Sequence, residues 1–392
     1  MVYDLRKKAE EELLNHIAPF WLKLIDNENG GFYGEVTYDL NVNKESIKGG
    51  IQTSRILWFF SAAYCSTKNE EFKKAATHAY KFLRDKLFDK EFKGIYWMVD
   101  CKGNPTDTRK HIYCQSFAIY ALSEYYKAVG DEQALSLAMN LFALIESKGF
   151  NKENSAYLEE FDREWNITPN EMLSENGVIA EITTNTHLHV LEAYTTLYEV
   201  TKDVIVGEKL KNLIYTFYNK IYDKEGHFFK IFFDNSWNTI IDLKSYGHDI
   251  EATWLIDDAY KSLGIKDENI EKMIIDVAYK ITEQIQEDGS LINEAENEVK
   301  DFTRVWWVQV EAMVGYLNAY ERTGDEEFLN IVNNLMTYTM KKVVDKRDGG
   351  EWYWSIEPNG KPTERSVIEP WKTPYHNGRF CLEFMKRIGE KK

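Results

Sequence analysis

The stretch Asn27-Glu28-Asn29-Gly30-Gly31-Phe32-Tyr33-Gly34 is a polar turn that opens into a short aromatic segment. The same combination of a turn and an aromatic or apolar segment returns at intervals of 61 to 70 residues, at Gly94, Ala156, Gly226, Gly289 and Gly350. Units that repeat at a fixed period stack on their neighbours, either as an open solenoid or as a closed ring. The chain therefore predicts six structural units of similar size.

Each unit is predicted to contain two helices of different character. The first unit begins with a helix over about residues 3–25, and a second helix starts at Gly50. The second is apolar nearly all round, which is typical of a buried helix, whereas the helix that follows Asn69 keeps a charged outer face. Asparagine or aspartate is a natural N-cap for each new outer helix, at Asn69, Asp131, Asp203, Asp267 and Asp325.

A ring of apolar helices inside a ring of amphipathic ones explains this alternation. The predicted fold class is all-α, an (α/α)6 barrel of six helical hairpins with long loops at one end. No Pro/Ser-rich linker divides the chain, so residues 1–392 are predicted to form a single barrel domain. An open helical solenoid is the competing arrangement.

The composition limits the possible partners. A formal net charge of −16 argues against nucleic acid or an anionic membrane as partner, and no apolar stretch approaches the length of a membrane span. The first residues are charged with no apolar run behind them, and the four cysteines lie far apart. Both features predict a protein of the reducing cytoplasm, which we expect to be a monomer. The aromatic content of 14% fits either core packing or sugar stacking.

Polar and aromatic residues recur at the predicted starts of the inner helices. In a closed ring all these starts lie at one end, so side chains that are hundreds of residues apart would surround one funnel. The residues in this phase of the repeat are Arg55, Tyr113, Gln115, Asn185, His187, His189, His248, Glu251, Trp306, Trp307, Glu311, His376 and Asn377. The pattern predicts a binding or catalytic site in the funnel.

The spacing of His248 and Glu251 indicates an acid–base function. Residues three apart share a helix face, so Glu251 can hold and tune His248 as a general base. The positive end of a helix dipole disfavours the imidazolium ion, which keeps a histidine there neutral. The alternative for His248, and equally for His376, is a structural helix cap.

Helical geometry also selects among the other candidates. Asn185 and His189 are four apart and share a face, whereas His187 diverges from His189, so His189 is the better candidate. Adjacent Trp306 and Trp307 are not expected to face the axis together, and both can be core residues.

Two further alternatives concern charge and metal. Arg55 can instead be the buried ion-pair partner of Glu35 or another acid. The histidines can also be read as metal ligands, but the many aromatic residues fit a sugar site better, and no metal is predicted. Neither a nucleotide-binding glycine motif nor GxSxG or HExxH is present, so no cofactor is predicted.

Three stretches carry a resemblance to a known family. They are Asn185-Thr186-His187-Leu188-His189-Val190-Leu191-Glu192, Tyr246-Gly247-His248-Asp249-Ile250-Glu251 and Glu369-Pro370-Trp371-Lys372-Thr373-Pro374-Tyr375-His376-Asn377-Gly378-Arg379. They closely resemble the cellobiose 2-epimerase family of the N-acylglucosamine 2-epimerase superfamily, and the likeness runs nearly end to end. The resemblance implies an (α/α)6 barrel, in agreement with the repeat.

The resemblance also implies roles for the catalytic candidates. His248 and His376 look like the acid/base pair acting at C2 of a reducing-end glucose. His189 looks like the histidine that opens the sugar ring, and Glu251 looks like the carboxylate that orients a catalytic histidine.

The remaining candidates look like substrate-binding residues. By the resemblance, Arg55 binds oxygen near the reacting carbons, Asn185 and Tyr113 contact the sugar, and the stacking platforms are Trp371 and one of Trp306 and Trp307.

The expected reaction is epimerisation of the reducing-end glucose of β-1,4-linked disaccharides, such as cellobiose, lactose and mannobiose-like sugars, to mannose. Removal of the C2 proton requires a neutral base and stabilisation of an enediolate. The alternatives are an aldose–ketose isomerase on the same barrel, a glycoside hydrolase using Asp162 or Glu251 as a carboxylate, and a sugar-binding protein without catalysis.

Overall fold

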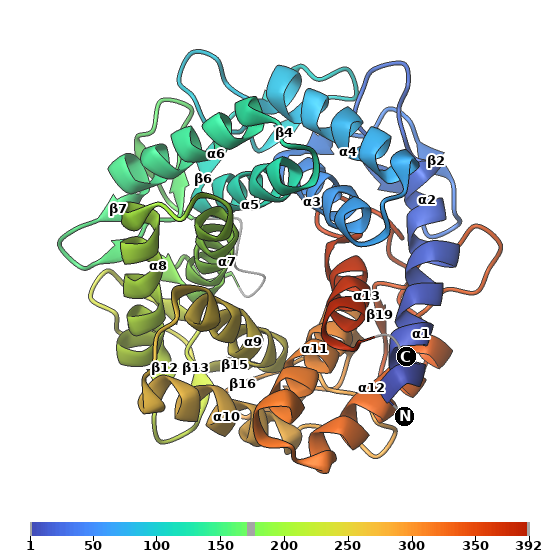
Figure 1. The fold of residues 1–392 in the computed structure, drawn as a ribbon, viewed down its shortest axis with the longest axis vertical. Helices are drawn as coiled ribbons and strands as arrows, with labels where there is room; N and C mark the ends of the chain where they lie inside the picture. Colours follow the sequence, from blue (N-terminus) through green and yellow to red (C-terminus); the bar gives the residue numbers. More distant parts are fainter. Residues whose placement is uncertain (1, 171–176, 390–392) are drawn as a thin grey trace.

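The computed structural model describes residues 2–170 and 177–389, and its helices form two concentric rings (Figure 1). Each inner helix packs against the next one in the chain, and the last, α13, packs against the first, α3. The inner helices are α3 Gly50–Thr67, α5 Ile112–Val129, α7 Thr184–Thr201, α9 Tyr246–Leu263, α11 Trp306–Thr323 and α13 Tyr375–Arg387. The predicted (α/α)6 barrel is confirmed, and the open solenoid is wrong.

The outer helices alternate with the inner ones along the chain. The outer elements are α1 Val2–Glu12, η1 Leu13–Ile17, α2 Ala18–Leu22, α4 Glu70–Phe82, η2 Leu83–Leu87, α6 Glu132–Leu144, η3 Ile145–Gly149, α8 Val204–Thr216, η4 Phe217–Ile221, α10 Glu268–Thr282 and α12 Glu326–Lys342. Three outer helices, α4, α6 and α8, each end in a π-helical turn. The N-terminal helix contains a π-helical turn between α1 and α2. Among the described residues, no helix combines the length and apolarity that crossing a membrane requires.

Short strands connect each outer helix to the following inner helix. In the described residues, five ladders join a strand of one unit to a strand of the next, namely β3 with β4, β6 with β9, β11 with β14, β15 with β16 and β18 with β19. The strands are β1 Glu35–Val36, β2 Val42–Asn43, β3 Lys48–Gly49, β4 Met98–Val99, β5 Pro105–Asp107, β6 Lys110–His111, β7 Phe150–Asn151, β8 Ala156–Tyr157, β9 Glu160–Phe161, β10 Ile167–Thr168, β11 Ile182–Thr183, β12 Tyr222–Asp223, β13 Phe228–Phe229, β14 Phe232–Phe233, β15 Leu243–Ser245, β16 Glu294–Glu296, β17 Val299–Asp301, β18 Arg304–Val305 and β19 Ser355–Ile356.

The ring is closed at a seam between the first and the sixth unit. Val36 and Ile368 form an antiparallel bridge in which each backbone N–H donates to the other carbonyl at 3.1 Å. On the outer side, the Trp352 indole N–H donates to the Glu12 carboxylate at 2.8 Å. Segments more than 300 residues apart are thereby held together.

The predicted N-caps are confirmed at all five outer helices that follow a tight turn. The side chains of Asn69, Asp131, Asp203, Asp267 and Asp325 each accept a hydrogen bond from a backbone N–H in the first turn. These bonds satisfy donors that a helix start leaves without a partner.

A side chain at the fourth position of four inner helices fastens the preceding loop, and we call these contacts the loop clamps. Gln115 accepts from the Ile95 N–H at 2.7 Å and donates to the Ile95 carbonyl at 2.9 Å, and Gln309 holds Leu291 in the same way. The other two clamps accept one backbone N–H each, His187 from Tyr157 and Asp249 from Phe229. Burial raises the pKa of Asp249 to about 8, so this acid is largely neutral at pH 7 and resembles the amides.

One prediction follows from the capping at the start of α6. Asp131 accepts from the N–H groups of Gln133 and Ala134 at 2.9 and 3.1 Å. Asp131→Ala should lower the free energy of unfolding by about 1 kcal/mol in urea titration. Gln133→Ala, an exposed change in the same turn, should alter it by less than about 0.5 kcal/mol. Equal effects of the two substitutions would contradict the capping role.

Candidate active site

A cavity of about 370 Å³ opens where the inner helices begin. The ten residues to which a catalytic or substrate-binding role was assigned line this cavity, although they come from six different helices or the loops before them. They are Arg55, Tyr113, Asn185, His189, His248, Glu251, Trp306, Trp307, Trp371 and His376. Four other residues of the same repeat phase are not among its lining residues: Gln115, His187, Glu311 and Asn377. The prediction that residues of one repeat phase meet at one end of the ring is confirmed.

His248 has a different partner from the one the spacing predicted. Its Nδ1 shares a hydrogen bond of 2.7 Å with the Ser245 hydroxyl, and Glu251 is engaged elsewhere. His248 is the third residue of α9, so its side chain leans back toward the residue before the helix. Burial, followed by repulsion from His189, lowers the pKa of His248 to about 3. The imidazole is therefore neutral at physiological pH and can accept a proton.

His376 is held by two carboxylates from neighbouring inner helices. Its Nδ1 lies 2.7 Å from Glu311 Oε1 and 4.0 Å from Glu251 Oε1, and only 6% of the residue is exposed. Burial and the positive charges of Arg55 and Arg379 lower the pKa of His376 well below its usual value. This second imidazole is also neutral.

Trp307 contacts both imidazoles. Its indole is 4.8 Å from the ring centre of His248 and 5.5 Å from that of His376. Trp306 also lines the cavity, with its ring 5.3 Å from His376. The expectation that only one of the adjacent tryptophans faces the axis is wrong, because both stand in the first turn of α11, where a large side chain extends past the helix end.

The structure distinguishes the two histidines of the HxH pair. His189 lines the cavity, and its Nδ1 is hydrogen-bonded to Glu192 at 2.9 Å. His187 instead hydrogen-bonds the Thr183 carbonyl through Nδ1. Its Nε2 accepts the Tyr157 N–H, which is the loop-clamp contact. The preference for His189 is confirmed as a matter of geometry.

Arg55 crosses the cavity wall between the first, second and sixth units. Its guanidinium donates to the Trp371 carbonyl at 3.0 Å and to the Tyr113 hydroxyl at 2.8 Å, and it stacks on Phe117. The alternative of an ion pair with Glu35 is wrong, because Glu35 accepts from Asn43 and Ser366 instead.

Three buried polar atoms of cavity-lining residues have no hydrogen-bond partner within the described chain. They are Arg55 Nε, Asn185 Oδ1 and Trp306 Nε1. An unpaired buried donor or acceptor costs about 1–3 kcal/mol.

A buried charge cluster lies beneath the cavity, and it contains the residues that sequence reasoning missed. Arg379 forms ion pairs with Glu192, Glu251 and Glu311, and the last of these measures 2.7 Å. The signal was present in the sequence, because Glu192 follows His189 at the same spacing that was applied to His248 and Glu251.

The same cluster provides the set of side chains in the described residues that best resembles a metal site. Ligand atoms of Glu251, Glu311 and His376 lie within 4.8 Å of one another. Arg379 already pairs with both carboxylates, so its positive charge opposes a cation at this place.

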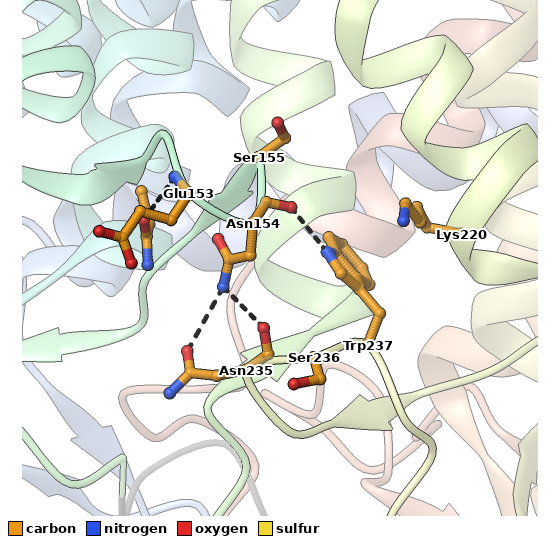
Figure 2. A pocket seen from close by; sticks show the side chains of 8 residues that line it. Glu153, Asn154, Ser155, Lys220, Asn235, Ser236 and Trp237 are labelled. Atoms are coloured by element: carbon orange, nitrogen blue, oxygen red, sulfur yellow. Dashed lines mark hydrogen bonds between the residues drawn. The ribbon is translucent and has the colours of Figure 1, made fainter.

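A second pocket lies on the surface, between a hairpin loop and a turn (Figure 2). Its lining includes Asn154 and Trp237, and the Trp237 indole N–H donates to the Asn154 carbonyl at 2.9 Å.

Asp162, which was considered as a hydrolase carboxylate, lies at the surface, where it accepts a hydrogen bond from Asn166 in a turn. A hydrolase pair of Asp162 and Glu251 is therefore not brought together in the central cavity.

Comparisons with known proteins agree with this site. The family model of N-acylglucosamine 2-epimerase (GlcNAc 2-epimerase) matches residues 30–378. A cellobiose 2-epimerase of Dictyoglomus turgidum is 46% identical, covering 98% of this chain and 99% of that protein, and one of Ruminococcus albus is 46% identical, covering 99% of both. The solved cellobiose 2-epimerase of Bacillus thermoamylovorans is 56% identical with a TM-score of 0.96, covering 98% of this chain and 99% of that one. The chain therefore belongs to the N-acylglucosamine 2-epimerase family.

Proposed function

We propose that the protein is a cellobiose 2-epimerase, which converts the reducing-end glucose of β-1,4-linked disaccharides such as cellobiose and lactose to mannose. The observation that carries the proposal is the pair of neutral imidazoles, His248 and His376, which line one cavity and both lie within 5.5 Å of the Trp307 indole. The near full-length relatives that bear this name support it.

The proposed reaction needs a base on each face of the sugar carbon. One histidine takes the C2 proton of the open-chain aldose onto its Nε2. The other, which has first taken up a proton from solvent on its own Nε2, donates that proton to the opposite face after the intermediate turns about its C2–C3 bond. In both residues Nδ1 is bound by the protein, by Ser245 and by Glu311, so Nε2 remains for the substrate. A base that is neutral at physiological pH is what this step requires.

The enediolate intermediate carries negative charge on oxygen. Arg55 is held by Trp371 and Tyr113 at the cavity wall, and its fixed guanidinium can stabilise that charge without reorganisation. The starts of the inner helices add partial positive charge from the same side.

Ring opening precedes proton abstraction, because only the open-chain aldehyde makes the C2 proton acidic. His189 is the proposed acid–base for this step, and Glu192 fixes its orientation through Nδ1. Asn185 lies four residues earlier on the same face and also lines the cavity, where it is placed to contact the sugar.

The proposal includes no cofactor and no metal, because the proton transfers need only these side chains. It also includes a cytoplasmic, monomeric enzyme. The free thiols of Cys65, Cys101, Cys114 and Cys381 support the reducing compartment.

The first prediction concerns the product. Incubation with cellobiose in heavy water should give the mannose-ended disaccharide with deuterium at C2, detected by NMR and chromatography, because the abstracted proton is exchanged with solvent. A fructose-ended product would instead support the isomerase, free glucose would support the hydrolase, and unchanged cellobiose would support a binding protein.

The second prediction concerns the two imidazoles. His248→Ala and His376→Ala should each lower kcat by at least about 10²-fold, which is the lower end of what general acid–base catalysis contributes. His227→Ala is the matched control, since His227 bonds Tyr222 away from the cavity and should retain near-normal kcat. Circular dichroism should confirm that all three variants are folded, and a folded variant with near-normal kcat would refute the role of that histidine.

The third prediction concerns metal. Dialysis against EDTA should leave kcat within about twofold of its starting value, because Arg379 neutralises the carboxylates that a cation would need. Loss of activity that returns on addition of a divalent metal would contradict this.

A further inference from the structure

Arg379 is the central charge of the cluster beneath the cavity. The residue has no exposed surface, and its guanidinium pairs with three carboxylates that come from three inner helices, Glu192 on α7, Glu251 on α9 and Glu311 on α11. It also stacks on the Trp254 ring at 4.7 Å. One rigid planar donor thus fixes three helices relative to α13.

Two of these carboxylates are the ones that bind catalytic candidates. Glu192 holds His189 Nδ1 at 2.9 Å, and Glu311 holds His376 Nδ1 at 2.7 Å. Each imidazole is therefore joined to Arg379 through a single carboxylate. Tyr375 adds a further link, because its hydroxyl donates to Glu192 at 2.6 Å and also contacts Arg379.

We propose that Arg379 is a positioning residue that couples His189 to His376, so that the ring-opening group and a proton-transfer group keep matched orientation and charge. The inference rests on the proposed function, and it names a residue that acts on the reaction without touching the sugar. Burial raises the pKa of Glu311, and Arg379 opposes that rise, so the guanidinium favours an ionised carboxylate that directs its imidazole with a defined Nδ1–H. Without the guanidinium, the carboxylate would draw a proton onto the imidazole more strongly.

The charges around Arg379 determine in which direction the pKa of a neighbouring group changes when Arg379 is lost. The titratable and charged groups that face it from the packed helices are Arg55 on α3, Tyr120 on α5, His189 and Glu192 on α7, His248 and Glu251 on α9, Glu311 on α11, and Tyr375 and His376 on α13. Burial opposes the charge of Glu192, yet Arg379 and His189 keep its pKa lowered. Burial and Glu311 raise the pKa of Glu251 to about 7, and Arg379 opposes that rise.

The sign of the pH effect follows from the lost positive charge. Without Arg379, its repulsion of the His376 imidazolium disappears and Glu311 attracts that form more strongly, so the pKa of His376 rises. A base must be neutral, so the acidic limb of kcat/KM should move to higher pH. A purely structural residue would lower stability without moving this limb.

The experiment compares Arg379→Gln with Arg387→Gln. Arg387 lies two turns later on α13 and pairs with Asp258, Glu321 and Glu383, away from the carboxylates that bind histidine. The acidic limb of Arg379→Gln should move up by at least about one pH unit, and its kcat at neutral pH should fall at least about tenfold. In Arg387→Gln, the acidic limb of kcat/KM should stay at the pH found for the unmodified protein.

Arg379→Lys is a second variant for the same pH measurement. It can be used if Arg379→Gln does not fold. Lysine keeps the charge but lacks the planar fork that meets several carboxylates. We expect this variant to regain part of kcat with a smaller displacement of the limb. An unmoved limb in the folded lysine and glutamine variants would overturn the inference.

Imidazole NMR titration separates this inference from the proposed function. In Arg379→Gln, or in Arg379→Lys if that variant alone folds, the imidazole signals of both His189 and His376 should shift from their positions in the unmodified protein, because the carboxylate behind each ring loses its guanidinium contact, and the His376 signal should titrate at higher pH. A response of only one histidine would overturn the coupling. If cellobiose is not epimerised at all, the proposed function fails, and the NMR titration still decides whether Arg379 connects the two imidazoles.

Discussion

The backbone bridge between Val36 and Ile368, together with the packing of α13 on α3, is the constraint on which the site depends. His376 belongs to the last helix and Arg55 to the first inner one, and only a closed ring brings them to the same cavity. The hydrogen bond from Arg55 to the Trp371 carbonyl crosses this seam, so the join is itself part of the cavity wall. Closure of the ring is therefore what brings the residues of the cavity together.

Burial then determines the chemistry that the assembled residues can perform. The low dielectric surroundings favour neutral imidazoles, and this outcome suits the proposed abstraction of a proton from carbon. The same surroundings make isolated carboxylates expensive. The buried acids are therefore accompanied either by a guanidinium, as with Glu192 and Arg379, or by a raised pKa, as with Asp249.

Much of this architecture could be predicted from the sequence, because the repeat, the helix caps and the apolar character of the inner helices are local signals. Nine of the ten cavity residues were found because helix starts are regular positions in a ring, and Trp371 was found through the resemblance to a known family. The hydrogen-bond partners were not found in the same way. Spacing alone allowed Glu251 to hold His248, but Ser245 does so, and Glu251 turns to Arg379 from another helix. Pairings of this kind depend on the rotation of each helix about its axis, which a pattern of apolar residues does not specify.

The first turns of the inner helices both anchor the preceding loops and line the cavity, and the loop clamps assign these two functions to different residues. Gln115, His187, Asp249 and Gln309 attach the backbone of the funnel rim, while neighbours such as Tyr113, His189 and Glu251 line the cavity. Rim loops anchored through main-chain atoms tolerate exchange of their own side chains. Evolution can therefore adapt the same barrel to a new sugar by altering the tips of the rim and leaving both the anchors and the catalytic ring intact.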